Sequence, residues 1–196
     1  MFTRFFGFAC VGLTLFIPNV LFAQAEVPRV EVGAHATLLK SDQLTPQGGT
    51  SNEAGFGGRF TINLKSWLST EAEINYFPKS TAPGNRTLGL FGVKAGWRAE
   101  RFGIFAKARP GILYFSDPRL PAPPFPSVGA CFGLRQKNFA MDVGGVVEGY
   151  LSRRTVVRID AGDTVTKLEK FCPYPPFAFP FTTHNPQLNI GFGLRF

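Results

Sequence analysis

The residues of this sequence that can do chemistry are mostly charged, and they recur at every second position of extended stretches. In a β-strand, side chains two positions apart lie on the same face, so Glu71 and Glu73 would share one space. The positions with this pattern are Glu31, Arg59, Glu71, Glu73, Lys94, Lys107, Arg109, Asp142, Glu148, Arg158, Asp160 and Arg195. Because both signs are present, the pattern predicts a network of ion pairs that fills an enclosed interior. The alternative interpretation is a narrow ion pathway, or a gate made of pairs that break.

Catalytic chemistry is not indicated. The chain has 2 histidines, His35 and His184, and neither is followed by a nearby serine that would complete a nucleophile and its base. Glu71 and Glu73 imitate a carboxylate pair, but neighbouring lysine or arginine would make them structural. No catalytic residue, metal site or cofactor is therefore predicted, since metal binding would need more ligands than lie near the cysteines.

Two cysteines, Cys131 and Cys172, fall in long connections between predicted strands. In a chain that is exported into an oxidising compartment, two thiols on neighbouring loops can form a bridge. We expect a disulfide between them, with two free thiols as the alternative. The third cysteine, Cys10, should be removed with the segment that contains it.

That segment, residues 1–25, is typical of a secretory signal peptide. It contains one charge, Arg4, then an apolar run, then Ala23-Gln24-Ala25. Cleavage is predicted between Ala25 and Glu26, which leaves residues 26–196 as a single domain. A membrane-spanning helix is the alternative, but glycine and proline interrupt the run.

Composition limits the class of protein. The formal net charge is +8, and the chain contains 22 Phe, 22 Gly and 16 Pro, which disfavour helix. In an exported chain, the counter-charge is expected from outer-membrane lipid and lipopolysaccharide headgroups, and no nucleic acid is expected as a partner. After Ala25 no apolar run is long enough for a membrane helix, so a membrane protein would have to be a barrel.

Alternation of apolar and polar residues predicts eight strands. They are expected at residues 29–40, 54–64, 68–77, 87–97, 102–112, 139–151, 155–162 and 186–196. Long connections at 41–53, 79–86, 116–137 and 165–185 alternate with short turns at 65–67, 98–101 and 152–154. An up-and-down barrel with short turns on one side of a membrane and longer loops on the other has this rhythm. Pro110, inside the fifth strand, should mark a bulge or the end of the membrane band.

Aromatic residues gather at the strand ends. Beside short turns or the terminus lie Trp67, Trp97, Phe102, Tyr150 and Phe196, and beside long loops lie Tyr76, Phe77, Tyr114 and Phe115. Two aromatic belts at the two membrane interfaces would give this distribution. Ordinary aromatic residues at strand ends are the alternative.

The last stretch, PQLNIGFGLRF, resembles the closing strand of bacterial outer-membrane β-barrels. Its apolar face consists of Leu188, Ile190, Phe192, Leu194 and Phe196. In those proteins the barrel-assembly machinery recognises the terminal phenylalanine. The resemblance therefore implies that Phe196 is an assembly signal and that this machinery is a partner.

Four stretches carry a wider resemblance: GGRFTINL, LSTEAEINYFP, MDVGGVVEGYLSRRTVVRID and LNIGFGLRF. They make the chain similar, over residues 29–196, to the small outer-membrane β-barrel family that includes the transmembrane domain of the outer membrane protein A type. The resemblance implies an all-β, eight-stranded antiparallel up-and-down transmembrane β-barrel in the outer membrane of a Gram-negative bacterium. It does not imply peptidoglycan binding, which belongs to two-domain members of the family.

We therefore expect a non-enzymatic integral outer-membrane protein. Family members are stabilising barrels, adhesins, receptors, small channels and occasionally lipid enzymes, so the expected role is structural or one of surface interaction through the outer loops, with an unidentified extracellular ligand. A narrow ion or small-solute pore is the alternative, and a lipid-modifying enzyme is less favoured.

Overall fold

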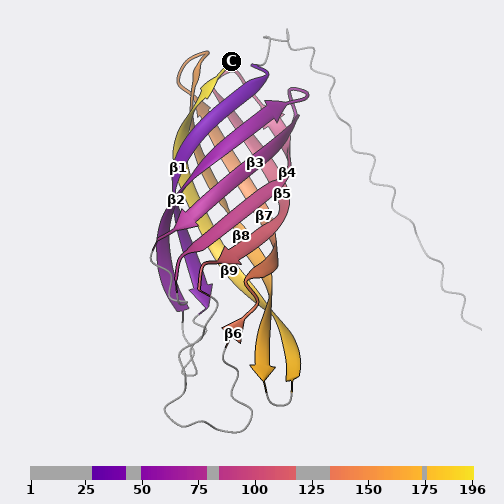
Figure 1. Cartoon of the computed structure of the whole chain (residues 1–196). Coiled ribbons are helices and arrows are strands. Elements are labelled where there is room, and N and C mark those ends of the chain that lie inside the picture. Colours follow the sequence, from indigo (N-terminus) through magenta and orange to yellow (C-terminus); the bar gives the residue numbers. More distant parts are fainter. Residues whose placement is uncertain (1–27, 43–49, 79–83, 118–132, 174–175) are drawn as a thin grey trace, which may run out of the picture.

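All regular structure is β-strand in the part of the chain that the computed structural model describes, residues 28–42, 50–78, 84–117, 133–173 and 176–196 (Figure 1). The strands are β1 (Val30–Asp42), β2 (Thr50–Asn63), β3 (Leu68–Phe77), β4 (Arg86–Arg98), β5 (Phe102–Phe115), β6 (Gly133–Leu134), β7 (Lys137–Tyr150), β8 (Thr155–Pro173) and β9 (Pro176–Arg195). These residues form no helix that is long and apolar enough to cross a membrane.

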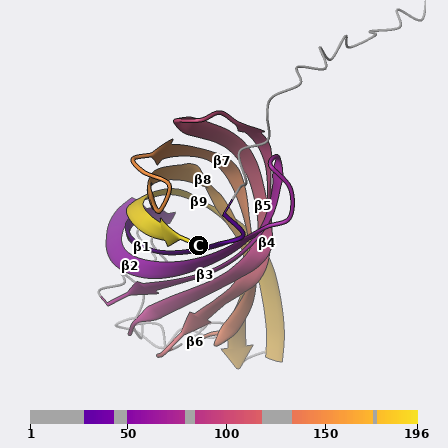
Figure 2. The ribbon, with the colours of Figure 1, turned by 90° about the horizontal axis from the view of Figure 1, so that it is seen from above.

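Eight of the strands form a closed antiparallel ring, which is visible along the barrel axis in Figure 2. Each strand pairs with the next in the order β1, β2, β3, β4, β5, β7, β8 and β9. β1 then pairs with β9, from Glu31 opposite Arg195 to Leu39 opposite Gln187, and this closes the barrel. β6 pairs with β8 outside the ring. The predicted all-β, eight-stranded barrel is confirmed.

Short turns connect the strands at one end of the barrel, at residues 64–67, 99–101 and 151–154. Backbone hydrogen bonds hold them, such as the bond of 3.0 Å from the Leu64 amide to the Leu68 carbonyl. The C-terminus lies at this same end (Figure 1), which we call the short-turn end. The longer connections lie at the opposite end, the long-loop end. The predicted alternation of short and long connections is confirmed as far as β8.

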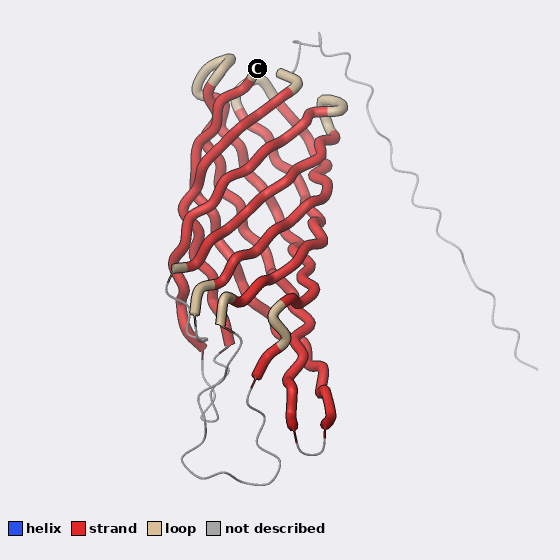
Figure 3. The backbone as a smooth tube through the Cα atoms, viewed as in Figure 1, coloured by secondary structure: helices blue, strands red, loops and turns tan. Residues whose placement is uncertain are grey.

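The last connection differs from the prediction of a loop over residues 165–185. β8 runs to Pro173, β9 begins at Pro176, and the two strands pair up to this tip. They project beyond the rest of the barrel as a two-stranded ribbon (Figure 3). From Pro176 to Pro186, β9 pairs with β8 alone among the described residues, so it is an edge strand there. Proline is tolerated on an edge strand, which explains why a segment with prolines such as Pro186 is not a loop.

Pro110 neither ends β5 nor creates a bulge. β5 continues to Phe115. The pairing of β4 with β5 is interrupted between Val93 and Leu90 and resumes in the same register, with Leu90 opposite Gly111. No residue is inserted, so the predicted bulge is absent. Proline lacks an N–H, and this accounts for a local loss of pairing without a shift in register.

The two faces of the barrel wall reverse the distribution of residues in a soluble protein. Outward positions carry large apolar side chains that are exposed, including Phe91 at 64% and Ile190 at 54%. Inward positions carry charged side chains that are buried, including Arg109 at 0% and Arg158 at 2%. This reversal follows from the period of two along each strand.

Whether an aromatic side chain points outward depends on which face of its strand it occupies, and not on its distance from a turn alone. The exposed ones near the short-turn end are Trp67, Trp97, Phe102 and Phe196. Phe77 and Phe115, however, are completely buried inside the barrel, and the Tyr150 hydroxyl reaches the buried carboxylate of Glu148. The prediction that Phe77, Phe115 and Tyr150 belong to outer aromatic belts is therefore wrong, because each occupies an inward position of its strand.

Two glycines on adjacent strands differ in the room around them. A Cβ at Gly111 of β5 would lie 2.0 Å from the carbonyl oxygen of Gly89 in β4. A Cβ at Gly89 would meet no atom within 4 Å. The close approach of these two strands therefore requires glycine at one position and not at the other.

We predict that Gly111→Ala lowers the free energy of unfolding by about 1–3 kcal/mol, because a backbone carbonyl cannot yield to the added methyl group without strain. Gly89→Ala is the matched control and should change stability by about 0.5 kcal/mol or less. Urea unfolding of the refolded barrel in detergent, followed by tryptophan fluorescence, measures both. Equal effects of the two substitutions would contradict the close approach.

Candidate functional site

The charged interior of the barrel is the candidate site. The structure places all of the charged residues that were predicted to share this space inside the barrel, and none of them is more than 6% exposed. They come from each of the eight strands of the ring. Three further inward charges were missed: Glu53, Arg86 and Arg98. Each lies on the inward face of its strand, just outside the predicted strand limits, in a segment that was predicted to be a loop or turn.

Arg109 of β5 contacts four carboxylates at once. Its Nη1 lies 2.7 Å from Glu73 Oε2 and 3.3 Å from Glu71 Oε2. Its Nη2 lies 3.3 Å from Asp160 Oδ2, and its Nε donates a hydrogen bond of 2.8 Å to Asp142 Oδ2. These carboxylates belong to β3, β7 and β8, so one guanidinium joins several walls of the barrel.

A second group of ion pairs surrounds Arg158 of β8. Its two terminal nitrogens contact Glu71 of β3, with Nη2 donating a bond of 2.9 Å to Oε2. Nη2 also lies 2.9 Å from Asp160, and Nη1 lies 3.6 Å from Glu148. Lys94 of β4 contacts both Glu148 and Glu71, the latter at 3.3 Å. Lys94, Arg109 and Arg158 therefore share one carboxylate, that of Glu71.

The network also provides separate counter-charges for two lysines that face each other. Lys94 and Lys107 lie directly opposite each other on β4 and β5, and like charges in this position destabilise a sheet when they are unopposed. Their ammonium groups turn to different partners: Lys94 to Glu148, and Lys107 to Asp160 and to Asp142 at 2.7 Å. Each cation therefore has its own counter-charge.

Aromatic and charged groups close the interior at the short-turn end. The Tyr150 hydroxyl donates a bond of 3.0 Å to Glu148. The guanidinium carbons of Arg195 and Arg98 lie 4.2 Å and 5.6 Å from the Tyr150 ring centroid. Arg195 also donates from Nε to Glu31 Oε1 at 3.2 Å.

The interior at the long-loop end contains a cluster of apolar side chains. The buried cluster consists of Leu39, Phe77, Leu88, Leu90, Leu113, Phe115, Ala140 and Leu168. Charged residues alone were singled out for the interior from the sequence, so this cluster is a finding of the structure. Its signal in the sequence is the alternation along each strand, because its members occupy inward positions.

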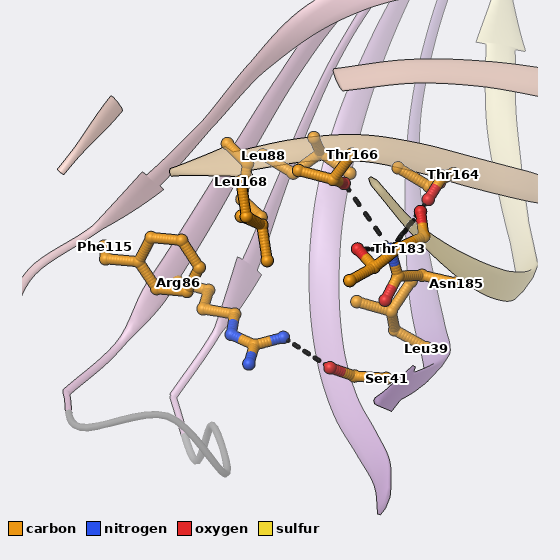
Figure 4. Close-up of a pocket in the computed structure, with 11 residues that line it drawn as sticks. Leu39, Ser41, Arg86, Leu88, Phe115, Thr164, Thr166, Leu168, Thr183 and Asn185 are labelled. Carbon is orange, nitrogen blue, oxygen red and sulfur yellow. Dashed lines mark hydrogen bonds between the residues drawn. The ribbon is translucent and has the colours of Figure 1, made fainter. Parts of the chain in front are cut away.

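A small pocket lies beside this apolar cluster (Figure 4). Leucines, Phe115, Arg86, Ser41, threonines and Asn185 line it. The polar groups bind one another: Asn185 donates to the Thr164 carbonyl at 2.8 Å, and Arg86 Nη1 donates to the Ser41 hydroxyl at 2.8 Å. Arg86 also lies 3.3 Å from Glu53. The pocket therefore offers apolar surface and engaged polar groups.

The two histidines are far apart and engaged. His35 Nε2 lies 2.6 Å from Asn75 Oδ1 in the interior, and His184 Nδ1 lies 2.6 Å from Asp163 Oδ2 on an exposed surface. Across the described ranges, no group of three or more His, Cys, Asp or Glu side chains is arranged to hold a metal ion.

Two sequence predictions fall outside the described residues. The signal peptide over residues 1–25 is one of them, and Cys131 is part of the other. The backbone of Cys172 lies in β8, opposite Phe177 of β9, but its side chain is not among those described. The disulfide between Cys131 and Cys172 stays a prediction.

A closed barrel of eight antiparallel strands, with an apolar outer face and a filled, charged interior, defines the architecture of small outer-membrane β-barrels. No protein-family model and no curated protein matches the chain. Among solved structures, it is similar to Neisserial surface protein A, with a TM-score of 0.55 and 16% identity over 85% of this chain and 97% of that one. It is also similar to Ail, the attachment invasion locus protein of Yersinia pestis, with a TM-score of 0.50 and 14% identity over 86% and 99% of the two chains. The likeness shows a shared fold.

We predict that Arg109→Gln destabilises the barrel by about 3–5 kcal/mol, because it leaves buried carboxylates without a shared counter-charge. Arg135→Gln is the matched control: this arginine pairs with Glu169 at 2.9 Å, but its side chain is 64% exposed. Its loss should cost about 1 kcal/mol or less. Denaturant unfolding in the same detergent compares the two, and a similar loss in both variants would show that the Arg109 contacts do not stabilise the fold.

Proposed function

We propose that this chain is an integral barrel of the outer membrane of a Gram-negative bacterium, with a closed interior and a non-enzymatic role in envelope structure or surface interaction. The reversed distribution of residues carries the proposal. Large side chains such as Phe91, Ile104 and Ile190 are exposed on the outer face, while charges fill the interior. An outer face of this kind is stable when hydrocarbon surrounds it.

The C-terminal end supports assembly by the route that its sequence implies. Phe196 is 69% exposed beside the seam where β1 and β9 close the ring. Its backbone amide donates a bond of 2.8 Å to the Val30 carbonyl. The aromatic side chain therefore remains available for the barrel-assembly machinery while the backbone completes the seam. Export through the predicted signal peptide belongs to the same proposal.

The long-loop end is the proposed outer surface. The β8–β9 ribbon projects from it (Figure 3), where it would meet an extracellular ligand. Lys137 and Lys167 are exposed on neighbouring strands close to this end, where they can face the anionic groups of outer-membrane lipid or lipopolysaccharide. The similar structures are a surface protein and an attachment protein by name, and a surface role for this chain agrees with both.

A closed interior is favoured over a pore. Eight strands enclose a space that side chains can fill, and the ion pairs of Arg109 and Arg158 cross it. An ion would have to pass this network of ion pairs. A lipid-modifying activity has no specific support, since His35 and His184 are held by an amide and a carboxylate.

We predict that Ile190→Arg reduces insertion into the outer membrane. Ile190 faces outward near the middle of the part of β9 that pairs with β1, and arginine at the membrane midplane costs about 2–4 kcal/mol. Leu151→Arg is the control, because Leu151 lies in a turn where the cost should be about 0–1 kcal/mol. The measurement is the fraction of protein in the outer membrane whose gel mobility changes on heating. If wild-type protein is found outside the membrane with no heat-dependent shift, the proposal fails.

We predict that the wild-type barrel gives no discrete conductance steps in planar lipid bilayers, because buried ion pairs cross its interior. Steps that disappear or change size in Arg109→Ala would support the pore alternative. Arg135→Ala controls for charge outside the interior, and circular dichroism of each variant shows that it is folded before it is added to the bilayer.

A further inference from the structure

Arg59 is the exception within the charged interior. It lies in β2, is 5% exposed, and pairs across the sheet with Gly33 of β1 and Glu73 of β3. Its Nε and Nη2 have no hydrogen-bond partner. Among the described residues, it forms no ion pair, although every other buried arginine of the interior does.

The charge count of the interior shows why Arg59 has no partner. Ion pairs join one continuous network, with His35 counted as neutral. Its carboxylates are Glu31, Glu71, Glu73, Asp142, Glu148 and Asp160, and its cations are Lys94, Arg98, Lys107, Arg109, Arg158 and Arg195. The two sets are equal in number, and Glu53 pairs separately with Arg86. Within the part of the chain that the structure describes, Arg59 is the positive charge left over.

On the β1 side, the wall beside Arg59 offers it no side chain. Gly33 of β1 lies opposite Arg59, and Gly193 of β9 lies opposite Gly33. The Arg59 Nη2 lies 3.0 Å from the place where a Cβ of Gly33 would be. The guanidinium therefore lies over bare backbone, on the side away from Glu73.

The geometry of the free donors indicates the kind of partner that fits. Nε and Nη2 form one edge of the guanidinium, and their N–H bonds point in parallel toward a single acceptor. A buried charge without a counter-charge is strongly unfavourable, whereas a paired one can be accommodated. The burial of Arg59 favours a small partner over a large one.

We propose that the Arg59 edge binds a small inorganic anion, a halide such as chloride, inside the barrel. The anion neutralises the one excess charge and accepts the two free N–H groups. It also explains how a cation is kept at a position where the carboxylate across the sheet, that of Glu73, forms an ion pair with Arg109. This inference does not depend on which membrane contains the barrel or on what its loops contact.

The direct test is crystallisation of the full mature barrel in detergent with sodium bromide as the halide. We expect an anomalous bromide peak at about hydrogen-bond distance from Arg59 Nε and Nη2. A water molecule with no anomalous signal at this position would overturn the proposal. Bromide peaks only on exposed basic residues such as Arg135 would also overturn it.

The second test compares stability in sodium bromide with that in sodium gluconate at equal ionic strength. Wild-type protein should show a saturable increase in its unfolding midpoint with bromide. At a concentration 100-fold above the dissociation constant, the unfolding equilibrium constant should fall about 100-fold. Arg59→Gln should lose this response, while Arg135→Gln should keep it.

The sign of the Arg59→Gln effect should depend on the salt. In gluconate the variant should be at least as stable as wild-type protein, because an uncompensated buried charge has been removed. In saturating bromide wild-type protein should gain relative to the variant. If Arg59→Gln fails to fold, Arg59→Met removes the same donors, and the wild-type bromide peak still decides. An equal bromide response in wild-type protein and variant would contradict the proposal.

Discussion

Charges of both signs inside a narrow barrel must neutralise one another, and the arrangement of the strands depends on this constraint. Water cannot solvate these groups fully in so small a space, so each needs partners from other walls. Arg158 of β8 and Glu71 of β3 are 87 positions apart in the chain, yet they share two hydrogen bonds. Arg109 of β5 adds contacts to β3 and β8. These contacts join strands that are not neighbours in the sheet, which the backbone ladder alone does not do.

The interior is divided into two chemical zones. The large ion-pair network occupies the region from the short-turn end through the middle, and the apolar cluster lies toward the long-loop end beside buried threonines and Asn185. Arg86 lies at the level of Phe77 and Phe115, opposite both in the sheet. A charge can be held there because Arg86 has a carboxylate of its own, that of Glu53 at 3.3 Å, and the Phe115 ring at 5.2 Å.

The fold and the facing of most residues could be predicted because a period of two is a local property of the sequence. The alternation of side chains between the two faces was enough to predict that Glu71, Lys107 and Asp160 lie inside. The same alternation would also have predicted an inward position for Phe115. What could not be predicted is the pairing, because the contact between Arg158 and Glu71 depends on register around the whole ring. The β8–β9 ribbon was missed because proline predicts a loop when the neighbours of a strand are unknown. Likewise, the lack of a partner for Arg59 becomes visible only when all the interior charges are counted together.

The ribbon at the long-loop end has a consequence for how these molecules behave when they are crowded side by side. Among the described residues, no strand pairs with the β1-facing edge of β9 before Gln187, and an open edge can recruit a strand from another molecule and start a fibre or a domain-swapped pair. Pro180 and Pro186 lie on this open edge, an even number of residues apart, so both remove a donor from the same side of the strand. A foreign strand would find gaps in the row of N–H groups. Each barrel can therefore carry a long projecting ribbon and still remain a separate molecule.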